Sequence, residues 1–437
     1  MNSARKTRHA APGRTSTKPL ASAYDTQVRA ADALRRKGAH AEALQAFHAL
    51  SQHHPDRADA HSNLAGMLQA TGHPTPALQA ITRALELDSS NVAALRNLAE
   101  ILKDFGEWQA VLDTYDAALA LQPDAPVLRF ARGLQLLMLG RWHDGWRDHE
   151  QRWMVPDMPL GTSRLQSPPW DGGALHDRHI ILDHEQGFGD QLMFVRFARD
   201  VAARGGRVTI RCAAPLVQLV AALPGIATVI SDADPVPPHD VHASLMSLPY
   251  LLGIDRPALL DGAAYLQPVS ECPETIRSAL APGVPQVGLV WAGNPRHRND
   301  ARRSIAPALL QPLLQTAGVR FTSLQRHDGS LRMPTEWRDT VHDLGDALTS
   351  FNDTAHALLR LDLLITVDTA IAHLAGALGV PTLLLVPFLP DWRWMVDRTD
   401  TPWYDSVQLL RQNVLFEWQP VIAAARLHVE RLTAPSR

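Results

Sequence analysis

The stretch from Leu363 to Leu385 constrains the fold more than any other part of the chain. An apolar run at its start is followed by Asp368 and Thr369, two residue types favoured at the N-terminus of a helix. Small and apolar residues then continue at helical spacing up to Gly379, and a second apolar run ends the stretch. Strands that are apolar throughout are typical of buried parallel strands, so the stretch predicts a strand–helix–strand unit of a parallel sheet.

Three polar side chains interrupt this apolar stretch where ligands commonly bind. Asp368, Thr369 and His373 lie at or within one turn of the N-terminus of the predicted helix. Open α/β sheets bind ligands at the carboxyl ends of their strands, and helix N-termini favour phosphate. The pattern therefore predicts a nucleotide-phosphate site. The alternative is structural, with Asp368 or Thr369 serving as a helix cap and His373 as part of the capped turn.

The composition excludes several classes of protein. A chain of 437 residues predicts two or three domains, and a net charge of −3 gives no reason to expect nucleic acid as a partner. Two cysteines cannot form a disulfide framework, which favours a cytoplasmic location. The chain contains no C-x-x-C motif, so the cysteines do not predict a zinc site. No apolar run is long enough to predict a membrane span. Residues 1–22 are basic and rich in Ser, Thr, Pro and Ala, which predicts a disordered tail.

A repeat of 34 residues organises the first third of the chain. Four glycines recur at this interval, namely Gly38, Gly72, Gly106 and Gly140. A small residue precedes each of them at a constant distance, namely Ala31, Ala65, Ala99 and Gly133. Each glycine would end one helix and begin a turn, and the small residues would let paired helices approach closely. Helix–turn–helix units with this period resemble tetratricopeptide repeats.

The repeat array is expected to cover residues 23–155. Its fourth copy is degenerate and contains Trp142, Trp146 and Trp153, which indicates a capping repeat docked onto the next domain. Solenoids of this kind present a concave face that accepts ligands, although the pattern does not identify the ligand. Residues 156–174 are rich in Pro, Gly and Ser and are interpreted as a linker.

A second strand–helix–strand pattern follows the linker. Apolar residues predict a strand at 180–183, a helix at 191–203 and a strand at 208–212. The loop before the helix contains Gly187 and Gly189, which would let the backbone approach a ligand closely, but it matches neither a dinucleotide fingerprint nor a P-loop. Asp190 lies at the start of the helix. Glu185 and Gln186 are secondary site candidates in the same loop.

Polar residues also follow the strands of another predicted α/β region that begins near residue 284. Asn294 follows a strand at 286–291, and Gln325 follows a strand at 319–324. Four arginines between positions 296 and 303 follow the first of these strands. Such a run is usually a solvated loop, but arginines at a strand's carboxyl end can also hold a diphosphate through bidentate contacts, which makes Arg302 and Arg303 candidates.

Three motifs of these regions resemble the bacterial heptosyltransferase-like glycosyltransferases of family 9. They are EQGFGD before a helix, WAGNP before the basic loop, and DTAIAHLAGALGVPT at the opening stretch. With the upstream repeats, the chain is also similar to bacterial relatives of O-linked N-acetylglucosamine transferase. The resemblance implies an α-helical tetratricopeptide solenoid followed by an α/β GT-B fold. In that fold two Rossmann-like domains, here residues 175–283 on the acceptor side and 284–437 on the donor side, face a cleft.

The resemblance implies inverting transfer of a sugar from a nucleotide-sugar donor to a protein or glycan acceptor, with no cofactor and no bound metal. Asp190 matches the acidic residue that is suggested as catalytic base in the family. Asp368, Thr369 and His373 match the motif that contacts the donor, and the other expected donor-binding residues are Arg302, Arg303, Asn294 and Gln325. The chain departs from the heptosyltransferases in having arginines where they carry a lysine.

Two other functions fit the same sequence. The missing lysine favours a non-catalytic tetratricopeptide adaptor whose transferase domain is degenerate. A sugar-nucleotide epimerase built from two Rossmann domains would share the architecture, but the paired acidic and histidine residues of such sites cannot be placed in this chain. Detection of free epimerised sugar in place of glycosylated acceptor would favour the epimerase.

Overall fold

A computed structural model describes residues 22–156, 158, 165–297, 299–326 and 332–433. The tail predicted at residues 1–22 therefore lies outside the described residues except for Ser22. The chain divides into two compact units, Met1–Ile101 and Leu102–Arg437, and each is described by itself. None of the described helices is both long and apolar enough to cross a membrane.

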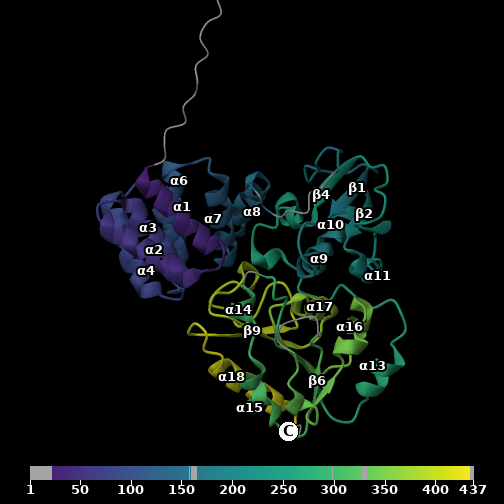
Figure 1. The fold of residues 1–437 in the computed structure, drawn as a ribbon. Helices are drawn as coiled ribbons and strands as arrows, with labels where there is room; N and C mark the ends of the chain where they lie inside the picture. Colours follow the sequence, from purple (N-terminus) through teal and green to yellow (C-terminus); the bar gives the residue numbers. More distant parts are fainter. Residues whose placement is uncertain (1–21, 157, 159–164, 298, 327–331, 434–437) are drawn as a thin grey trace, which may run out of the picture. The chain divides into compact units, whose positions relative to one another are not determined.

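The first unit consists of paired helices (Figure 1). They are α1 (Ala23–Arg36), α2 (His40–His53), α3 (Ala58–Ala70), α4 (Pro74–Leu87) and most of α5 (Val92–Lys103). Ser22 caps α1 in a reciprocal capping box with Asp25. Gly38 and Gly72 take the left-handed conformation at the turns, with φ of 78° and 80°, as the repeat predicts. The predicted helical solenoid is confirmed.

The second unit begins with three more helices that continue the repeat, α6 (Trp108–Leu121), α7 (Pro126–Met138) and α8 (Trp142–His149), and a 3₁₀ turn (Glu150–Met154) follows them. Gly133 of α7 lies directly against the end of α8. A Cβ atom at this position would be 2.8 Å from the backbone nitrogen of His149. The small residue predicted from the repeat is therefore required for α7 and α8 to approach each other.

The first sheet of the second unit has four parallel strands in the order β3-β2-β1-β4. They are β1 (His179–Asp183), β2 (Arg207–Cys212), β3 (Thr228–Ser231) and β4 (Val241–Ser244). Short helices connect or flank them: α9 (Phe188–Phe194), α10 (Ala198–Ala202), α11 (Val217–Val220) and α12 (Leu248–Leu251). The next helix, α13 (Glu274–Ala279), lies beside α16 (Phe351–Leu358) of the second sheet instead (Figure 1). Strand β4 begins inside the segment 234–242, which is rich in Pro and His.

Two further features of this half differ from the sequence prediction. Helix α9 starts at Phe188, three residues before the predicted start, because Gly187 takes the extended N-cap conformation. The predicted linker already joins the sheet at its end, since Pro169 bridges to His242 and the backbone nitrogen of Trp170 donates to the His242 carbonyl at 2.7 Å. Trp170 is buried.

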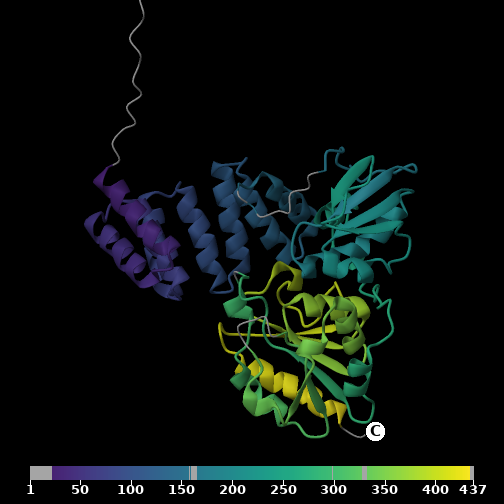
Figure 2. The ribbon, with the colours of Figure 1, turned by 45° about the vertical axis from the view of Figure 1, so that its right-hand side comes forward.

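The second sheet has six parallel strands in the order β10-β9-β8-β5-β6-β7, and Figure 2 shows the two sheets as separate groups. The strands are β5 (Gln286–Val290), β6 (Arg320–Ser323), β7 (Val341–Asp343), β8 (Leu363–Val367), β9 (Thr382–Val386) and β10 (Val407–Arg411). The helices are α14 (Asp300–Arg303), α15 (Gln311–Leu314), α16 (Phe351–Leu358), α17 (Ala370–Leu378) and α18 (Gln419–Leu432).

The strand–helix–strand unit predicted at Leu363–Leu385 is confirmed as β8-α17-β9, and Gly379 ends α17 with φ of 76°. Between β5 and β6 the chain forms a 3₁₀ turn (Pro307–Leu310) followed by the short α15 in place of one continuous helix. Pro312 explains the interruption, because it lacks the backbone N–H that a continuous helix would need there. Strand β10 is an addition that the sequence reading missed.

Aromatic side chains join α8 to both α/β halves. Trp142 stacks on Trp403, with ring centroids 5.1 Å apart and planes at 25°. Trp146 meets Trp392 edge-on at 5.3 Å and Phe194 at 6.2 Å. The last repeat therefore docks onto the α/β region as expected, through two of its three tryptophans. Trp153 remains 42% exposed.

We predict that Gly133→Ala destabilises the second unit by about 1–3 kcal/mol, because the new methyl group overlaps the backbone at the end of α8. All 11 tryptophans lie in this unit, so thermal unfolding followed by tryptophan fluorescence measures the effect.

The matched control is Gly66→Ala in α3, where the nearest atom to the new Cβ is 3.6 Å away. This variant should leave the fluorescence transition unchanged and should not lower the helical melting temperature followed by circular dichroism. Equal behaviour of the two variants would contradict the close packing of α7 and α8.

Candidate functional site

The glycine loop of the first α/β half lies against the N-terminus of α17 in the second. A Cβ atom on Gly189 would be 2.8 Å from Cδ2 of His373 and 3.6 Å from Cα of Ala370. The ring of Phe188 meets that of Phe351, at the start of α16, with centroids 5.1 Å apart. Two motifs that are more than 170 residues apart in the sequence are therefore direct neighbours.

Arg393 links the two halves at this point. Its Nη2 pairs with the carboxylate of Asp190, and its Nη1 donates to Oδ1 of Asp391 at 2.8 Å. The side chain is 9% exposed and lies over the Trp392 ring at 4.4 Å. Burial disfavours the charged guanidinium, but Asp391 and Asp190 raise its pKa above the usual value. Arg393 therefore stays charged in a largely buried position.

Asp190, the predicted base, lies in the first turn of α9. Burial raises the pKa of its carboxyl group, and the nearby Arg393 opposes this shift. A raised pKa makes a carboxylate a better proton acceptor near neutral pH. The residue thus has the environment of a general base, with its carboxylate in contact with Arg393.

Asp368 lies in the turn between β8 and α17. Burial raises its pKa to about 6, the charge of Asp391 adds to the rise, and Arg303 opposes it. Arg303 contacts the backbone of this turn, since its Nη1 donates to the Asp368 carbonyl oxygen at 2.8 Å. Its Nε is 3.3 Å from Oδ1 of Asp300. Arg303 therefore holds the turn in place as well as supplying positive charge.

His373 is buried in the first turns of α17. Its Nδ1 is 3.0 Å from the Tyr404 hydroxyl, its ring stacks on Trp394 at 5.1 Å, and its Nε2 is 4.0 Å from Oδ1 of Asp368. Burial lowers its pKa to about 3, and the charge of Arg393 contributes to the decrease. His373 is therefore neutral at physiological pH and acts as a hydrogen-bonding group.

Thr369 is the N-cap residue of α17, with an extended backbone and no side-chain capping bond. Its hydroxyl oxygen is buried and has no hydrogen-bond partner among the described residues. Because the first N–H groups of a helix also lack partners within the helix, this turn concentrates donors for an anion. We define Asp190, Asp368, Thr369, His373 and Arg393 as the polar cluster.

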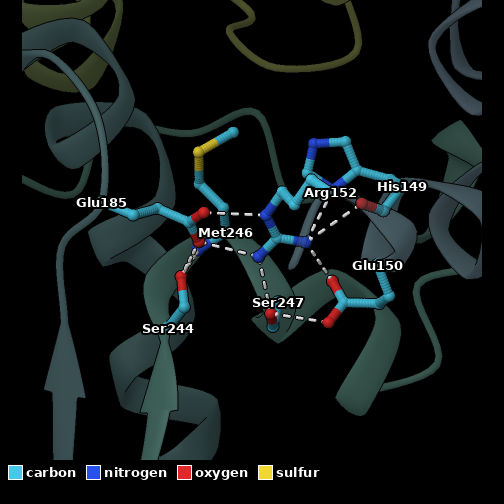
Figure 3. A network of polar contacts seen from close by, with 7 residues as sticks. All are labelled: His149, Glu150, Arg152, Glu185, Ser244, Met246 and Ser247. Carbon is cyan, nitrogen blue, oxygen red and sulfur yellow. Dashed lines mark hydrogen bonds and ion pairs between the residues drawn. The ribbon is translucent and has the colours of Figure 1, made fainter. Parts of the chain in front are cut away.

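Glu185 belongs to a second buried network (Figure 3). Arg152, which is fully buried, donates from Nε and Nη2 to the two carboxylate oxygens of Glu185, each at 2.7 Å. Ser244 also donates to Glu185, while Ser247 and Glu150 contact Arg152 at 2.8 and 2.5 Å. The carboxylate of Glu185 is therefore used to attach the β1–α9 loop to the end of the repeat array.

Two other predicted residues, Gln325 and Asn294, form hydrogen bonds with the backbone of the loop after β5. Gln325 is buried and accepts from the backbone nitrogens of Trp291 and Ala292, at 3.2 and 3.0 Å. Exposed Asn294 accepts from the Arg296 backbone at 3.0 Å, which forms a local turn. Gln325 and Asn294 thus shape the loop after β5.

Gln186 and Arg302 also make structural contacts. The carbonyl of exposed Gln186 accepts from Nε2 of Gln191 at 3.1 Å, and Gly187 is the N-cap residue of α9. Arg302 lies 3.9 Å from Asp104, in the turn between α5 and α6. The contacts that the structure describes for Gln325, Asn294, Gln186 and Arg302 therefore lie outside the polar cluster.

The sequence reasoning missed Arg393, Asp391, Trp394 and Tyr404. The sequence does contain a signal that could have identified Asp391 and Arg393. The segment from Asp391 to Trp394 follows closely on the carboxyl end of β9, and β9 lies next to β8 in the sheet. Polar residues after neighbouring parallel strands meet at one edge of the sheet.

Neither the cavity lined in part by Arg196 nor any group of metal-ligating side chains in the described part of the chain points to the polar cluster. A cavity of about 310 Å³ is lined by α9–α10 residues such as Arg196 and by the segment around Leu260, but by no member of the polar cluster. Among the described residues, no group of three or more His, Cys, Asp and Glu side chains is arranged to hold a metal ion. The geometry around Asp190, Asp368 and Arg393 is the better indicator of chemistry because it combines buried charges from both halves.

Comparisons with known proteins identify the repeats. A tetratricopeptide repeat family model matches residues 94–126, so the chain contains tetratricopeptide repeats. Protein FlbA of Caulobacter vibrioides is 27% identical over 430 residues, which cover 89% of this chain and 70% of FlbA.

Two solved structures are also similar in part. The MamA protein is 20% identical and the match covers 29% of this chain and 70% of MamA, with a TM-score of 0.26. A tetratricopeptide repeat protein from Parabacteroides merdae is 22% identical and the match covers 32% of this chain and 55% of that protein, with a TM-score of 0.27.

We predict that Arg152→Ala destabilises the second unit by about 3–5 kcal/mol, because Glu185 would be left buried without a cation. Chemical unfolding followed by tryptophan fluorescence measures this loss. The control Arg199→Ala removes an ion pair of the same unit, with Asp261, whose side chains are 53% and 55% exposed. It should cost at most about 0.5 kcal/mol, and a similarly small loss for Arg152→Ala would contradict the structural role of this network.

We predict that His373 makes the protein less stable as the pH falls. Its folded-state pKa lies below the ordinary value, so protons bind more strongly to the unfolded chain and stability is lost between about pH 6.5 and pH 3. His373→Gln should remove about 2 kcal/mol of the difference between pH 7.5 and pH 5.

The measurement is chemical unfolding of both proteins at the two pH values. Asp368 is present in both proteins. Its raised pKa has the opposite effect on stability, because its destabilising negative charge is neutralised as the pH falls through about 6 and the folded state then becomes more stable. Identical pH dependence of the variant and the wild type would contradict a buried neutral His373.

Proposed function

We propose that the α/β region is a GT-B glycosyltransferase that moves a sugar, with inversion and without a bound metal, from a nucleotide-sugar donor to a protein or glycan acceptor. One observation supports this most strongly. The glycine loop with Asp190 and the Asp368–His373 turn come from different α/β halves and are in contact at Gly189. Each motif has a structural explanation alone, but their meeting in a buried polar cluster fits a site that handles both acceptor and donor.

Asp190 is assigned as the general base. In the reaction its carboxylate takes the proton of the acceptor hydroxyl, whose oxygen forms a bond to the anomeric carbon. The bond from that carbon to the phosphate oxygen breaks at the opposite face, and the nucleotide leaves with the electron pair. The raised pKa of Asp190 suits this role.

The second half is assigned to the leaving group. The N-terminus of α17 provides N–H groups and the hydroxyl of Thr369, and Arg303 and Arg393 provide positive charge. Neutral His373 is suited to donate or accept a hydrogen bond to the sugar or phosphate. Arginines can hold a phosphate as the family lysine does, so the missing lysine does not remove the required charge.

The repeat array is assigned to recruitment of the acceptor. Its tetratricopeptide repeats belong to a class of solenoids that bind ligands on an extended concave surface. The similarity to FlbA covers 89% of this chain and therefore extends over both the repeats and the α/β region. This supports a single function that uses the two parts together.

A non-catalytic adaptor is the second candidate. The side chains of Asp190, His373 and Arg393 are largely buried and already have partners within the protein. A transferase that had lost its activity could keep such a cluster for stability alone. The adaptor predicts no affinity for nucleotides, and the epimerase predicts free epimerised sugar.

The test is a thermal-shift titration of the full chain with UDP, ADP, GDP, CMP and their common sugar conjugates, with and without a chelator. A ligand that binds the folded state at about 100 times its Kd stabilises it by about 2.7 kcal/mol. The transferase predicts selective stabilisation that the chelator does not abolish. The absence of a shift with every nucleotide at millimolar concentration would favour the adaptor.

We predict that Asp190→Asn lowers the rate of sugar transfer by about 10²–10⁴-fold, because the amide cannot accept the acceptor's proton. Binding of the donor that the titration identifies should be retained. Transfer is measured as release of nucleotide from that donor. The control Asp200→Asn changes an exposed acid of α10 in the same half, whose pKa is also raised by partial desolvation, and should remain active. Full activity of Asp190→Asn would exclude Asp190 as the base.

A further inference from the structure

Arg393 occupies an unusual position for a residue with a structural role alone. It contacts the proposed base Asp190 with one terminal nitrogen and Asp391 with the other, and its Nε is buried with no hydrogen-bond partner among the described residues. Asp368 is close enough for its charge to act on Arg393 as well. A buried guanidinium therefore pairs with two carboxylates and keeps Nε as a donor without a partner among the described residues.

The other two arginines near the site, Arg302 and Arg303, contact parts of the protein that are not side-chain carboxylates of both halves. Arg303 uses Nη1 on the Asp368 carbonyl and Nε on Asp300, so its removal would disturb the backbone of the turn. Arg302 is 3.9 Å from Asp104, at the turn between α5 and α6. Arg393 alone among these three binds side-chain carboxylates of both α/β halves, and a carboxylate can be exchanged for another anion.

A phosphate group is the anion that would compete best for Arg393. Phosphate oxygens accept bidentate hydrogen bonds from a guanidinium, as carboxylates do, and carry more charge. The N-terminus of α17, with Thr369 and its unpaired hydroxyl, lies close to Arg393, since the ring of His373 in the same helix stacks on Trp394, the residue that follows Arg393. A phosphate bound at this terminus would attract Arg393 away from Asp190.

We propose that Arg393 binds the phosphate of the nucleotide donor and that its ion pair with Asp190 blocks the base until the donor is bound. This inference rests on the proposed function. In the structure described here the Asp190 carboxylate is occupied by Arg393 and cannot accept a proton efficiently. Transfer of Arg393 to the donor phosphate breaks only this ion pair, and it leaves Asp190 free to act on the acceptor hydroxyl. Donor binding then precedes activation of the acceptor.

In this mechanism the carboxylate of Asp190 and the phosphate of the donor compete for the guanidinium of Arg393. Removing the charge of Asp190 should therefore strengthen nucleotide binding, although Asp190 itself does not contact the nucleotide. A merely structural ion pair would not have this effect. The competition must also disappear when Arg393 is absent, which makes a double-mutant cycle the appropriate experiment.

The experiment is isothermal titration of the full chain with the nucleotide that stabilises it most in the thermal-shift panel. Arg393→Gln should weaken binding by about tenfold or more, and Asp190→Asn should strengthen it by about three- to tenfold. In the Arg393→Gln background, Asp190→Asn should change the affinity by less than about twofold. Arg132→Gln, which removes a pair with Asp116 and Asp148 in the helical part, is the control and should bind like wild type.

The possible outcomes separate the inference from the function on which it rests. Nucleotide binding by the wild type with no change in Asp190→Asn contradicts the inference and leaves the transferase assignment standing. Absence of nucleotide binding by the wild type contradicts both. If Arg393→Gln does not fold, the double variant Arg393→Gln/Asp190→Asn replaces it, because it removes both charges of the pair. Binding by this double variant as tight as that of Asp190→Asn would also overturn the role of Arg393.

Discussion

The contact between Gly189 and His373 is the constraint on which the candidate site depends. Any side chain at Gly189 would enter the space of the His373 ring and come close to the backbone of Ala370. Only a glycine lets the first turn of α9 approach α17 this closely, and the next residue, Asp190, is thereby brought within reach of Arg393. Asp190 and Arg393 form an ion pair between the two halves, so each of these charges has a partner in a largely buried position.

The last repeat of the helical array holds both loops that form this contact. Arg152 fixes Glu185, at the start of the glycine loop, through two hydrogen bonds of 2.7 Å. Trp146 packs against Trp392, which precedes Arg393 in the sequence. Within the second unit, the repeat is therefore a structural support for the polar cluster. This explains physically why the end of the array carries buried tryptophans and a fully buried arginine.

Local patterns predicted the parts of the structure that local forces determine. The β8-α17-β9 unit and the Asp368–His373 turn follow from apolar runs, a helix cap and a terminating glycine, all within one stretch. The role of Glu185 could not be predicted, because its partner Arg152 lies in the repeat array. The place of Arg393 after the carboxyl end of β9 could have been inferred from the sequence, but its pairing with Asp190 depends on how the two halves meet. Strand β10 is likewise recognised through its pairing with β9.

Hydrogen–deuterium exchange with and without the best-binding nucleotide tests most directly whether the two motifs form one site. The account predicts that the nucleotide protects the β1–α9 loop with Gly187–Asp190, the turn at Asp368–His373 and the segment around Arg393 together. Protection of segments from both α/β halves would support a shared donor site. Protection limited to one half, or to the helical repeats, would contradict the central claim.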